Sequence, residues 1–257
     1  MRPIGWLLFA CSLTLAAPSA AETSRLDAIL GSHVLKVGTT GDYRPFTALD
    51  RTSGEYSGFD VDLARSLGKA LGAKVEFVPT TWGALAHDLE GGAFDIAMGG
   101  VSVTLDRQKK GFFSAPYLRE GKMPIARCGD QTKYQTLADI DRPGVRVLAN
   151  PGGTNERFDQ AHLHAADIVA YPDNLTIFDR LAEGDADVMI TDASETRFEQ
   201  KLHPNVLCAI HPDKPFDFGE KAYWMPPDPA LKAFVDQWLH LAMESGEFDA
   251  VYGKWFR

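Results

Sequence analysis

The 257-residue sequence has few basic residues. Lys and Arg together number 26 against 35 Asp and Glu, a formal charge of −9, and no basic run offsets this excess. Such a chain is a poor binder of nucleic acid, whose phosphates are held by Lys and Arg, and of anionic membranes. Its hydrophobic fraction of 45% and charged fraction of 24% exclude a disordered chain. We therefore expect one large globular domain or two small ones, with no nucleic-acid partner.

Sequence motifs for nucleotides, metals and serine hydrolysis are also missing. There is no Gly-x-Gly-x-x-Gly, P-loop, His-Glu-x-x-His, Cys-x-x-Cys or Gly-x-Ser-x-Gly. His162 and His164 are two residues apart, so they point to different faces of a helix and make a poor metal pair. We expect no metal and no cofactor.

Long apolar runs are absent beyond the N-terminus. There Arg2 precedes an apolar stretch at residues 6–17 and small residues at 18–21, the three parts of an export signal. The stretch is shorter than the roughly 20 residues that span a bilayer. We therefore expect residues 1–21 to be a signal peptide, and the mature chain to be periplasmic and free of the membrane.

Cysteine is scarce, with three residues in the chain. Cys11 lies in the predicted signal peptide, which leaves Cys128 and Cys208. An even number of cysteines in an oxidising compartment favours a disulfide. Two separate buried thiols are the alternative.

Alternating strand-like and helix-like segments begin at residue 34. The order strand–helix–strand–helix–strand up to residue 98 indicates parallel pairing. The pattern restarts at residue 145, and residues 92–98 weakly resemble residues 184–190. These features predict an α/β protein of two similar lobes. The expected strands are 34–39, 74–79, 94–98, 145–149, 168–171, 187–190 and 206–210, and the expected helices are 58–71, 82–89, 154–163, 173–182, 193–202, 229–244 and 248–256.

Two extended stretches, near residues 119–125 and 215–223, can serve as crossovers between the lobes. We therefore assign residues 22–122 to lobe 1, residues 123–216 to lobe 2 and residues 217–257 to a return into lobe 1. Ligands of open parallel sheets collect beyond the carboxyl ends of strands. This rule predicts a site between the lobes, built from four segments, 39–43, 99–102, 150–154 and 191–195.

Several motifs resemble the amino-acid-binding family of periplasmic solute-binding proteins. They are residues 38–46 and 58–64, the segment 101–104 with Arg107, and residues 113–117, 153–156 and 253–256. The resemblance covers nearly the whole mature chain. It implies a type II periplasmic-binding-protein fold, with two lobes joined by two hinge strands that close over a small molecule.

Four stretches are more specifically similar to the periplasmic cyclohexadienyl dehydratases, enzymes on the solute-binding scaffold. They are residues 39–43, 150–156, 191–195 and 215–223. The resemblance implies conversion of prephenate to phenylpyruvate and of arogenate to phenylalanine, with loss of water and CO2 and without metal or redox cofactor. A non-catalytic amino-acid-binding protein of an ABC importer is the alternative. The oligomeric state stays open between the monomer usual for solute-binding relatives and a homo-oligomer.

Glu195 is the expected general acid, because this chemistry must protonate a departing hydroxyl. It follows Asp192 by three residues, so a helix places both on one face. A second carboxyl raises one pKa of such a pair, which favours a protonated donor. The resemblance implies that Asp192 grips a ligand's amino group. The alternative for Glu195 is an exposed residue in the first helical turn.

Cationic and hydroxyl groups are expected to hold the substrate. The resemblance implies that Arg107 grips a carboxylate, for which its planar guanidinium is suited, and that Lys122 binds a second carboxylate or the departing hydroxyl. Thr154 follows two glycines at a helix start, where it forms an anion site or an ordinary N-cap. Ser102 adds a hydroxyl donor. The alternatives are a surface Arg107 and a solvated hinge lysine.

Three further side chains are candidates for contact with the substrate. Trp82 and Tyr43 can pack on its ring, although an aromatic side chain in these places can equally be part of the core. Asn174 is a second-lobe contact or a helix cap.

Overall fold

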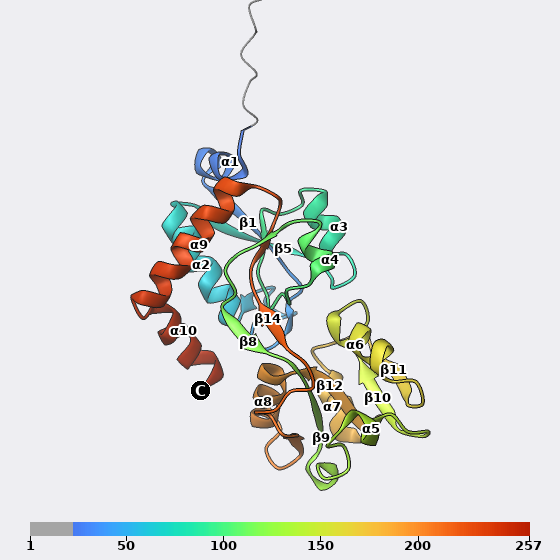
Figure 1. Cartoon of the computed structure of the whole chain (residues 1–257). Helices are drawn as coiled ribbons and strands as arrows, with labels where there is room; N and C mark the ends of the chain where they lie inside the picture. The colour runs from blue at the N-terminus through green and yellow to red at the C-terminus, as the bar shows by residue number, and fades with distance from the viewer. Residues whose placement is uncertain (1–22) are drawn as a thin grey trace, which may run out of the picture.

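The computed structural model describes residues 23–257 and contains a five-stranded sheet in each of two lobes (Figure 1). The predicted signal peptide at residues 1–21 lies outside the described residues. Figure 1 shows α1, α2 and α9 around the first sheet, and α5 to α8 around the second. None of the helices between residues 23 and 257 combines the length and apolar character that crossing a bilayer requires.

The first sheet has the strand order β5-β1-β6-β15-β7. β1 runs parallel to β5 and β6, whereas β15 is antiparallel to β6 and β7. The elements of this lobe are α1 (Arg25–Ser32), β1 (Val34–Thr39), β2 (Asp42–Tyr43), β3 (Thr47–Leu49), β4 (Tyr56–Ser57), α2 (Phe59–Leu71), β5 (Lys74–Pro79), α3 (Leu85–Glu90), β6 (Ile96–Ala97), α4 (Leu105–Gln108), β7 (Phe112–Phe113), β15 (Trp224–Met225), α9 (Pro229–Glu244) and α10 (Glu247–Phe256).

The second sheet has the order β11-β10-β12-β9-β13. β10 is parallel to β11 and β12, and β9 is antiparallel to β12 and β13. The elements are β9 (Lys122–Arg127), the 3-10 helix η1 (Cys128–Asp130), α5 (Leu137–Ile140), β10 (Arg146–Ala149), α6 (Thr154–His162), β11 (Asp167–Ala170), α7 (Ile177–Glu183), β12 (Val188–Asp192), α8 (Ala193–Leu202) and β13 (Leu207–Ala209).

Helix α2 illustrates how the sequence produces these elements. Its apolar face buries Phe59, Leu63 and Leu67, as helical spacing predicts. Gly58 precedes it at φ 138°, and a Cβ there would lie 2.2 Å from the backbone oxygen of Phe46, so only glycine fits. Glycine also ends the helix, since Gly72 adopts the left-handed conformation.

The parallel pairing expected for the strands up to residue 98 is confirmed, since β1 runs parallel to β5 and β6. Each lobe also contains antiparallel strands, because the chain enters each sheet a second time after crossing between the lobes. The helix expected at 173–182 begins only at Ile177. The Asp173 carboxylate accepts the Leu175 amide at 3.2 Å, and this side-chain turn replaces the first helical turn.

The crossovers are the paired strands β8 (Leu118–Glu120) and β14 (Gly219–Lys221), which lie side by side between the lobes (Figure 1). Their antiparallel register sets Gly219 opposite Glu120. β15, α9 and α10 follow β14, and β15 joins the first sheet. The division of the chain at residues 122 and 216 stays a prediction.

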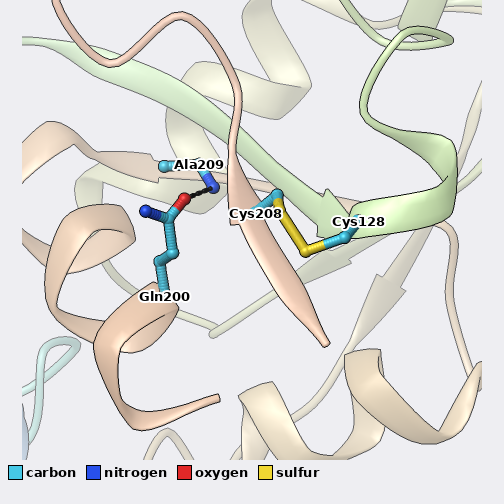
Figure 2. Close-up of a disulfide and its surroundings, with 4 residues drawn as sticks. All are labelled: Cys128, Gln200, Cys208 and Ala209. Carbon is cyan, nitrogen blue, oxygen red and sulfur yellow. Dashed lines mark hydrogen bonds between the residues drawn. A yellow bond between two sulfur atoms is a disulfide. The ribbon is translucent and has the colours of Figure 1, made fainter. Parts of the chain in front are cut away.

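Cys128 and Cys208 form a disulfide with a Cα–Cα distance of 4.8 Å (Figure 2). It joins the end of β9 to the edge strand β13 and closes a sequence separation of 80 residues. Figure 2 also shows Gln200 of α8, whose side-chain oxygen accepts the Ala209 amide at 2.8 Å. Covalent and hydrogen-bonded links thus fix this edge strand next to α8, the helix that carries Glu195.

Candidate active site

A cavity between the lobes is lined by residues from all four segments that the strand-end rule predicts. Six predicted site residues line it, together with Lys221 of the hinge and four residues that the sequence reasoning did not select. The lining residues are Tyr43, Trp82, Gly100, Ser102, Asn150, Gly153, Thr154, Asn155, Asn174, Asp192 and Lys221. Because both lobes and the hinge contribute, the site exists only when the lobes meet.

Asp192, at the end of β12, is the centre of the charge network. Its Oδ1 lies 2.8 Å from the Lys122 ammonium and its Oδ2 lies 2.5 Å from the Lys221 ammonium. The Tyr43 hydroxyl donates to the same Oδ2. Burial opposes ionisation of Asp192, but the two ammonium groups outweigh it and hold the pKa of this carboxyl below its usual range. Asp192 is therefore a buried carboxylate whose cationic partners belong to the chain itself.

Lys221 is the functional residue that the sequence reasoning missed. It is 1% exposed, and its Nζ donates to Ser102 Oγ at 2.9 Å while lying 3.5 Å from Glu120 Oε1. Burial alone would lower the pKa of Lys221, but Asp192 and Glu120 outweigh it and raise the pKa. The one sequence feature that pointed to Lys221 was its place in the stretch 215–223, which resembles the dehydratases. That was not enough to select it, because a lone lysine in a crossover is commonly solvent-exposed.

Glu195 lies in the first turn of α8 and is 1% exposed, so it is not the solvent-facing residue of the alternative interpretation. Thr191 Oγ1 donates to its Oε2 at 2.5 Å. Burial raises the pKa of Glu195 well above its usual value, and the nearby Glu199 and Asp192 raise it further, against the opposing effect of the Thr191 hydrogen bond. Burial therefore favours the protonated, neutral form of this carboxyl. Desolvation is the main cause, rather than the neighbouring carboxylate that the sequence suggested.

Lys122, the first residue of β9, contacts two neighbouring side chains at the start of α6. Its Nζ donates to Thr154 Oγ1 at 3.1 Å and to the side-chain oxygen of Asn155. Thr154 also lies 3.5 Å from Ser102 across the cleft. Lys122 is 5% exposed, so it is not a solvated hinge lysine. The N-cap of α6 is Gly153, which leaves the Thr154 hydroxyl free to face Lys122.

Arg107 is buried behind the cavity wall rather than in it. Its guanidinium donates to the Ser102 carbonyl at 2.8 Å and lies 6.0 Å from the centre of the Trp82 ring. Burial, with Arg157 nearby, lowers the pKa of Arg107 to about 10, so the group keeps its charge at neutral pH. It is therefore a buried cation next to the cavity, not the surface arginine of the alternative.

The remaining predicted residues close the cavity. The Tyr43 ring meets the Trp82 ring edge-on at 5.5 Å between centres. The Asn174 side chain reaches across the cleft and donates to the Asp42 carbonyl at 2.8 Å. Gly152 also lies at this contact, where a Cβ would be 2.8 Å from the Gly83 nitrogen and φ is +84°. Glycine is therefore required for the lobes to approach here.

Candidate metal ligands do not gather at this site. Between residues 23 and 257 no three His, Cys, Asp or Glu side chains are arranged to hold a metal ion. The polar groups that line the cavity are an ammonium, hydroxyls and amides, together with the carboxylate of Asp192.

Comparison with known proteins defines the class. Residues 35–257 match the family of bacterial extracellular solute-binding proteins, family 3, and the chain belongs to this family. A protein of Pseudomonas aeruginosa described as cyclohexadienyl dehydratase is 53% identical over 238 residues, covering 92% of this chain and 88% of that protein. The L-cystine-binding protein TcyJ of Escherichia coli K12 is 26% identical, covering 74% of this chain and 70% of that protein.

Solved structures give the same picture. An ancestral amino acid-binding protein, described as a precursor of cyclohexadienyl dehydratase, has a TM-score of 0.84 and 36% identity, covering 91% of this chain and all of that chain. An ancestral cyclohexadienyl dehydratase has a TM-score of 0.57 and 50% identity, covering 95% of this chain and 98% of that chain. The two-lobe fold of type II periplasmic binding proteins, implied by the sequence resemblance, is confirmed.

Proposed function

We propose that this chain catalyses the decarboxylative dehydration of prephenate to phenylpyruvate and of arogenate to phenylalanine, as a carbon–oxygen lyase. The observation that carries the proposal is Glu195, a buried carboxyl whose protonated form is favoured by burial and which lies close to a cavity lined by Lys221, with Lys122 and Arg107 buried nearby. The 53% identity to the cyclohexadienyl dehydratase of P. aeruginosa supports it. Fold alone would not, because this scaffold also carries proteins that only bind ligands.

The charge of the site suits a substrate with two carboxylates. Lys122 and Lys221 lie within 3 Å of Asp192, and Arg107 is buried next to them. Three cations thus lie around the ionised Asp192, while burial favours the neutral forms of the nearby Glu195 and of Glu120, which lies 3.5 Å from Lys221. In our proposal the carboxylates of prephenate are held by Lys122, Arg107 and the Thr154 hydroxyl. The enclosed site strengthens each of these interactions, because water does not screen them.

The proposed reaction requires one proton, delivered to the departing ring hydroxyl. The carbon–carbon bond to the ring carboxylate breaks, and CO2 leaves while its electron pair enters the ring. The carbon–oxygen bond to the ring hydroxyl breaks, and that oxygen takes the proton of Glu195 and leaves as water. The ring becomes aromatic, which drives the reaction, and Glu195 is left as a carboxylate that regains a proton from solvent. The role requires bound substrate to enlarge the cavity until its hydroxyl contacts Glu195.

The direct test is Glu195→Gln, which keeps the shape of the side chain and removes the proton. Phenylpyruvate formed from prephenate would be followed by its absorbance in alkali. General-acid catalysis contributes roughly 10²–10⁴-fold, so we expect turnover to fall by at least about 100-fold while prephenate still raises the melting temperature. Glu183→Gln, at an exposed position of α7, is the matched control. Joint loss of binding and turnover would assign Glu195 a structural role and contradict the proposal.

Amino-acid binding for an ABC importer is the second function class, supported by the family and by the 36% identity to an ancestral amino acid-binding protein. Any amino-acid ligand, arogenate included, brings an ammonium group that a carboxylate at the site would hold. Asp192 is the one carboxylate that lines the described cavity, and it is already paired with two lysines. An amino acid that raises the melting temperature, with no product from prephenate, would favour this second function.

We place the protein in the periplasm, since its family is extracellular and residues 1–21 are predicted to be an export signal. Assembly into a homo-oligomer stays a prediction, which light scattering on the purified mature chain would test.

A further inference from the structure

A continuous set of hydrogen bonds connects Lys122 to Glu195 through two residues that the mechanism above does not use. The Lys122 ammonium donates to the side-chain oxygen of Asn155. The Asn155 amide nitrogen lies 2.8 Å from Thr191 Oγ1, and Thr191 Oγ1 lies 2.5 Å from Glu195 Oε2. These four residues come from β9, α6, β12 and α8, and they are all at or next to the cavity.

Chemistry fixes the direction of the first two hydrogen bonds in this set, and in the third Thr191 Oγ1 is the donor to Glu195 Oε2. An ammonium has donors only, so Asn155 must turn its oxygen to Lys122 and its NH2 to Thr191. The Thr191 hydroxyl accepts that N–H, and its own hydrogen then points to Glu195 Oε2. Since Oε2 accepts a hydrogen bond, the proton of the neutral Glu195 carboxyl resides on Oε1.

This inference rests on the proposed dehydratase function. We propose that Asn155 and Thr191 are positioning residues that keep the proton of Glu195 on Oε1, the oxygen free to give it to the departing hydroxyl. The set also ties the orientation of the acid to Lys122, which we expect to hold the substrate. Substrate placement and proton delivery are thereby linked through side chains that do not react.

The hydrogen bond from Thr191 to Glu195 Oε2 also contributes while the proton is transferred. As the carbon–oxygen bond breaks with its electron pair, the hydrogen on Oε1 moves to the hydroxyl oxygen and negative charge develops on Glu195. The hydrogen bond from Thr191 to Oε2 becomes a bond to a carboxylate, which is stronger than one to a neutral acid. Because it strengthens only as charge develops, Thr191 stabilises the transition state more than the ground state.

The charged and titratable groups that face Glu195 come from four elements. They are Glu199 on α8, Asp192 on β12, Lys221 on β14 and Tyr43 on β2. Burial raises the pKa of Glu195, and the hydrogen bond from Thr191 opposes that rise. Removing the hydroxyl of Thr191 should therefore move the deprotonation of Glu195 to higher pH.

The test compares Thr191→Val with Thr191→Ser in the mature protein, with prephenate as substrate. Thr191 is 0% exposed; valine keeps its shape without the hydroxyl, and serine keeps the hydroxyl. For Thr191→Val we expect kcat to fall about 10- to 100-fold, a part of the roughly 10²–10⁴-fold effect of a general acid. KM should stay within about threefold, and the alkaline limb of the pH profile should move to higher pH. Thr191→Ser should keep kcat within about threefold of the unchanged protein.

Asn155→Asp tests the direction of the bonds. It keeps an acceptor for Lys122 but has no N–H for Thr191, so the Thr191 hydroxyl should turn away from Glu195. We expect kcat to fall about as much as in Thr191→Val. Melting temperatures of all three variants, measured without substrate, establish that each is folded.

Three results would overturn the inference. Unchanged kcat and pH profile in Thr191→Val would mean that the hydrogen bond positions nothing. Equal losses in Thr191→Ser and Thr191→Val, or a loss without movement of the alkaline limb, would mean that Thr191 acts through packing. No prephenate turnover in the unchanged protein would instead overturn the proposed function, and this inference with it.

Discussion

The cleft-facing end of β12 and the buried first turn of α8 each present one carboxyl group, three residues apart in sequence. Asp192 is 5% exposed and Glu195 is 1% exposed, so burial is nearly the same. Yet the pKa of Asp192 is below its usual range, and the pKa of Glu195 is well above it. The difference comes from their partners, because Asp192 has two ammonium groups and a phenol while Glu195 has one hydroxyl.

One short stretch of chain thus holds both a buried carboxylate and a buried proton donor. The charge on Asp192 stabilises the two buried lysines, whereas burial favours a proton on Glu195, which forms no ion pair with another described residue. Pairs of titratable groups with opposite environments are the usual arrangement for acid–base chemistry at neutral pH. The following changes each alter one side of the comparison.

Lys221→Met should have the largest effect, because it removes a cation from Asp192 and leaves buried carboxylates less well paired. Breaking a buried ion pair from one side costs about 3–5 kcal/mol, so we expect a loss of this size in the free energy of unfolding, with loss of turnover. Chemical denaturation at pH 7 would measure it. The matched control is Lys214→Met, at an exposed position. A stability equal to that of the control would contradict the role of Lys221.

Asp159→Asn extends the comparison to another buried carboxyl. Asp159 is 0% exposed, neither of its oxygens has a hydrogen-bond partner among the described residues, and burial raises its pKa to about 8. The unfolded chain loses this proton near pH 4, so the native protein loses stability as pH rises from about 4 to about 8.

The asparagine has no proton to lose, so the variant should be more stable than the unchanged protein at pH 8 and not at pH 4. A tenfold change in proton affinity is worth about 1.4 kcal/mol, so the shift from about 4 to about 8 is worth up to about 5 kcal/mol, and we expect a gain of this order at pH 8. Unfolding at both pH values measures the gain. An equal effect at both would mean that ionisation of Asp159 is not its cause.

Glu199→Gln should have the smallest effect of the three. Burial raises the pKa of Glu199 to about 7, and its charge above that pH raises the pKa of Glu195. Without it, Glu195 should lose its proton at lower pH, and the alkaline limb of the activity profile should move down by less than about one pH unit. An upward movement of that limb, or none, would show that Glu199 does not act on the acid.

Much of this site could be predicted from the sequence because its residues follow strands. Tyr43, Ser102, Thr154 and Asp192 each come directly after or near a strand end, and strand ends meet at one edge of a sheet. The proposed role of Glu195 rested on its three-residue spacing from Asp192 together with the family resemblance, since a lone glutamate in a first turn is ordinary.

The rest depends on contacts between segments far apart in the chain. The place of Asn155 between Lys122 and Thr191 depends on the packing of β9, α6 and β12, and the pairing of Lys221 with Asp192 depends on the hinge strand β14. The burial of Glu195 likewise appears only in the folded chain. Antiparallel β9 and β15 were missed for the same reason, because the return of the chain through the hinge leaves no local signal.

The central claim is that Glu195 carries a proton at neutral pH while Asp192 does not. The most direct measurement is the infrared difference spectrum between the unchanged protein and Glu195→Gln at pH 7. The account predicts the carbonyl stretch of a protonated carboxylic acid in the unchanged protein, lost in the variant. A difference spectrum with only the bands of an ionised carboxylate would contradict the account, because Glu195 would then have no proton to give.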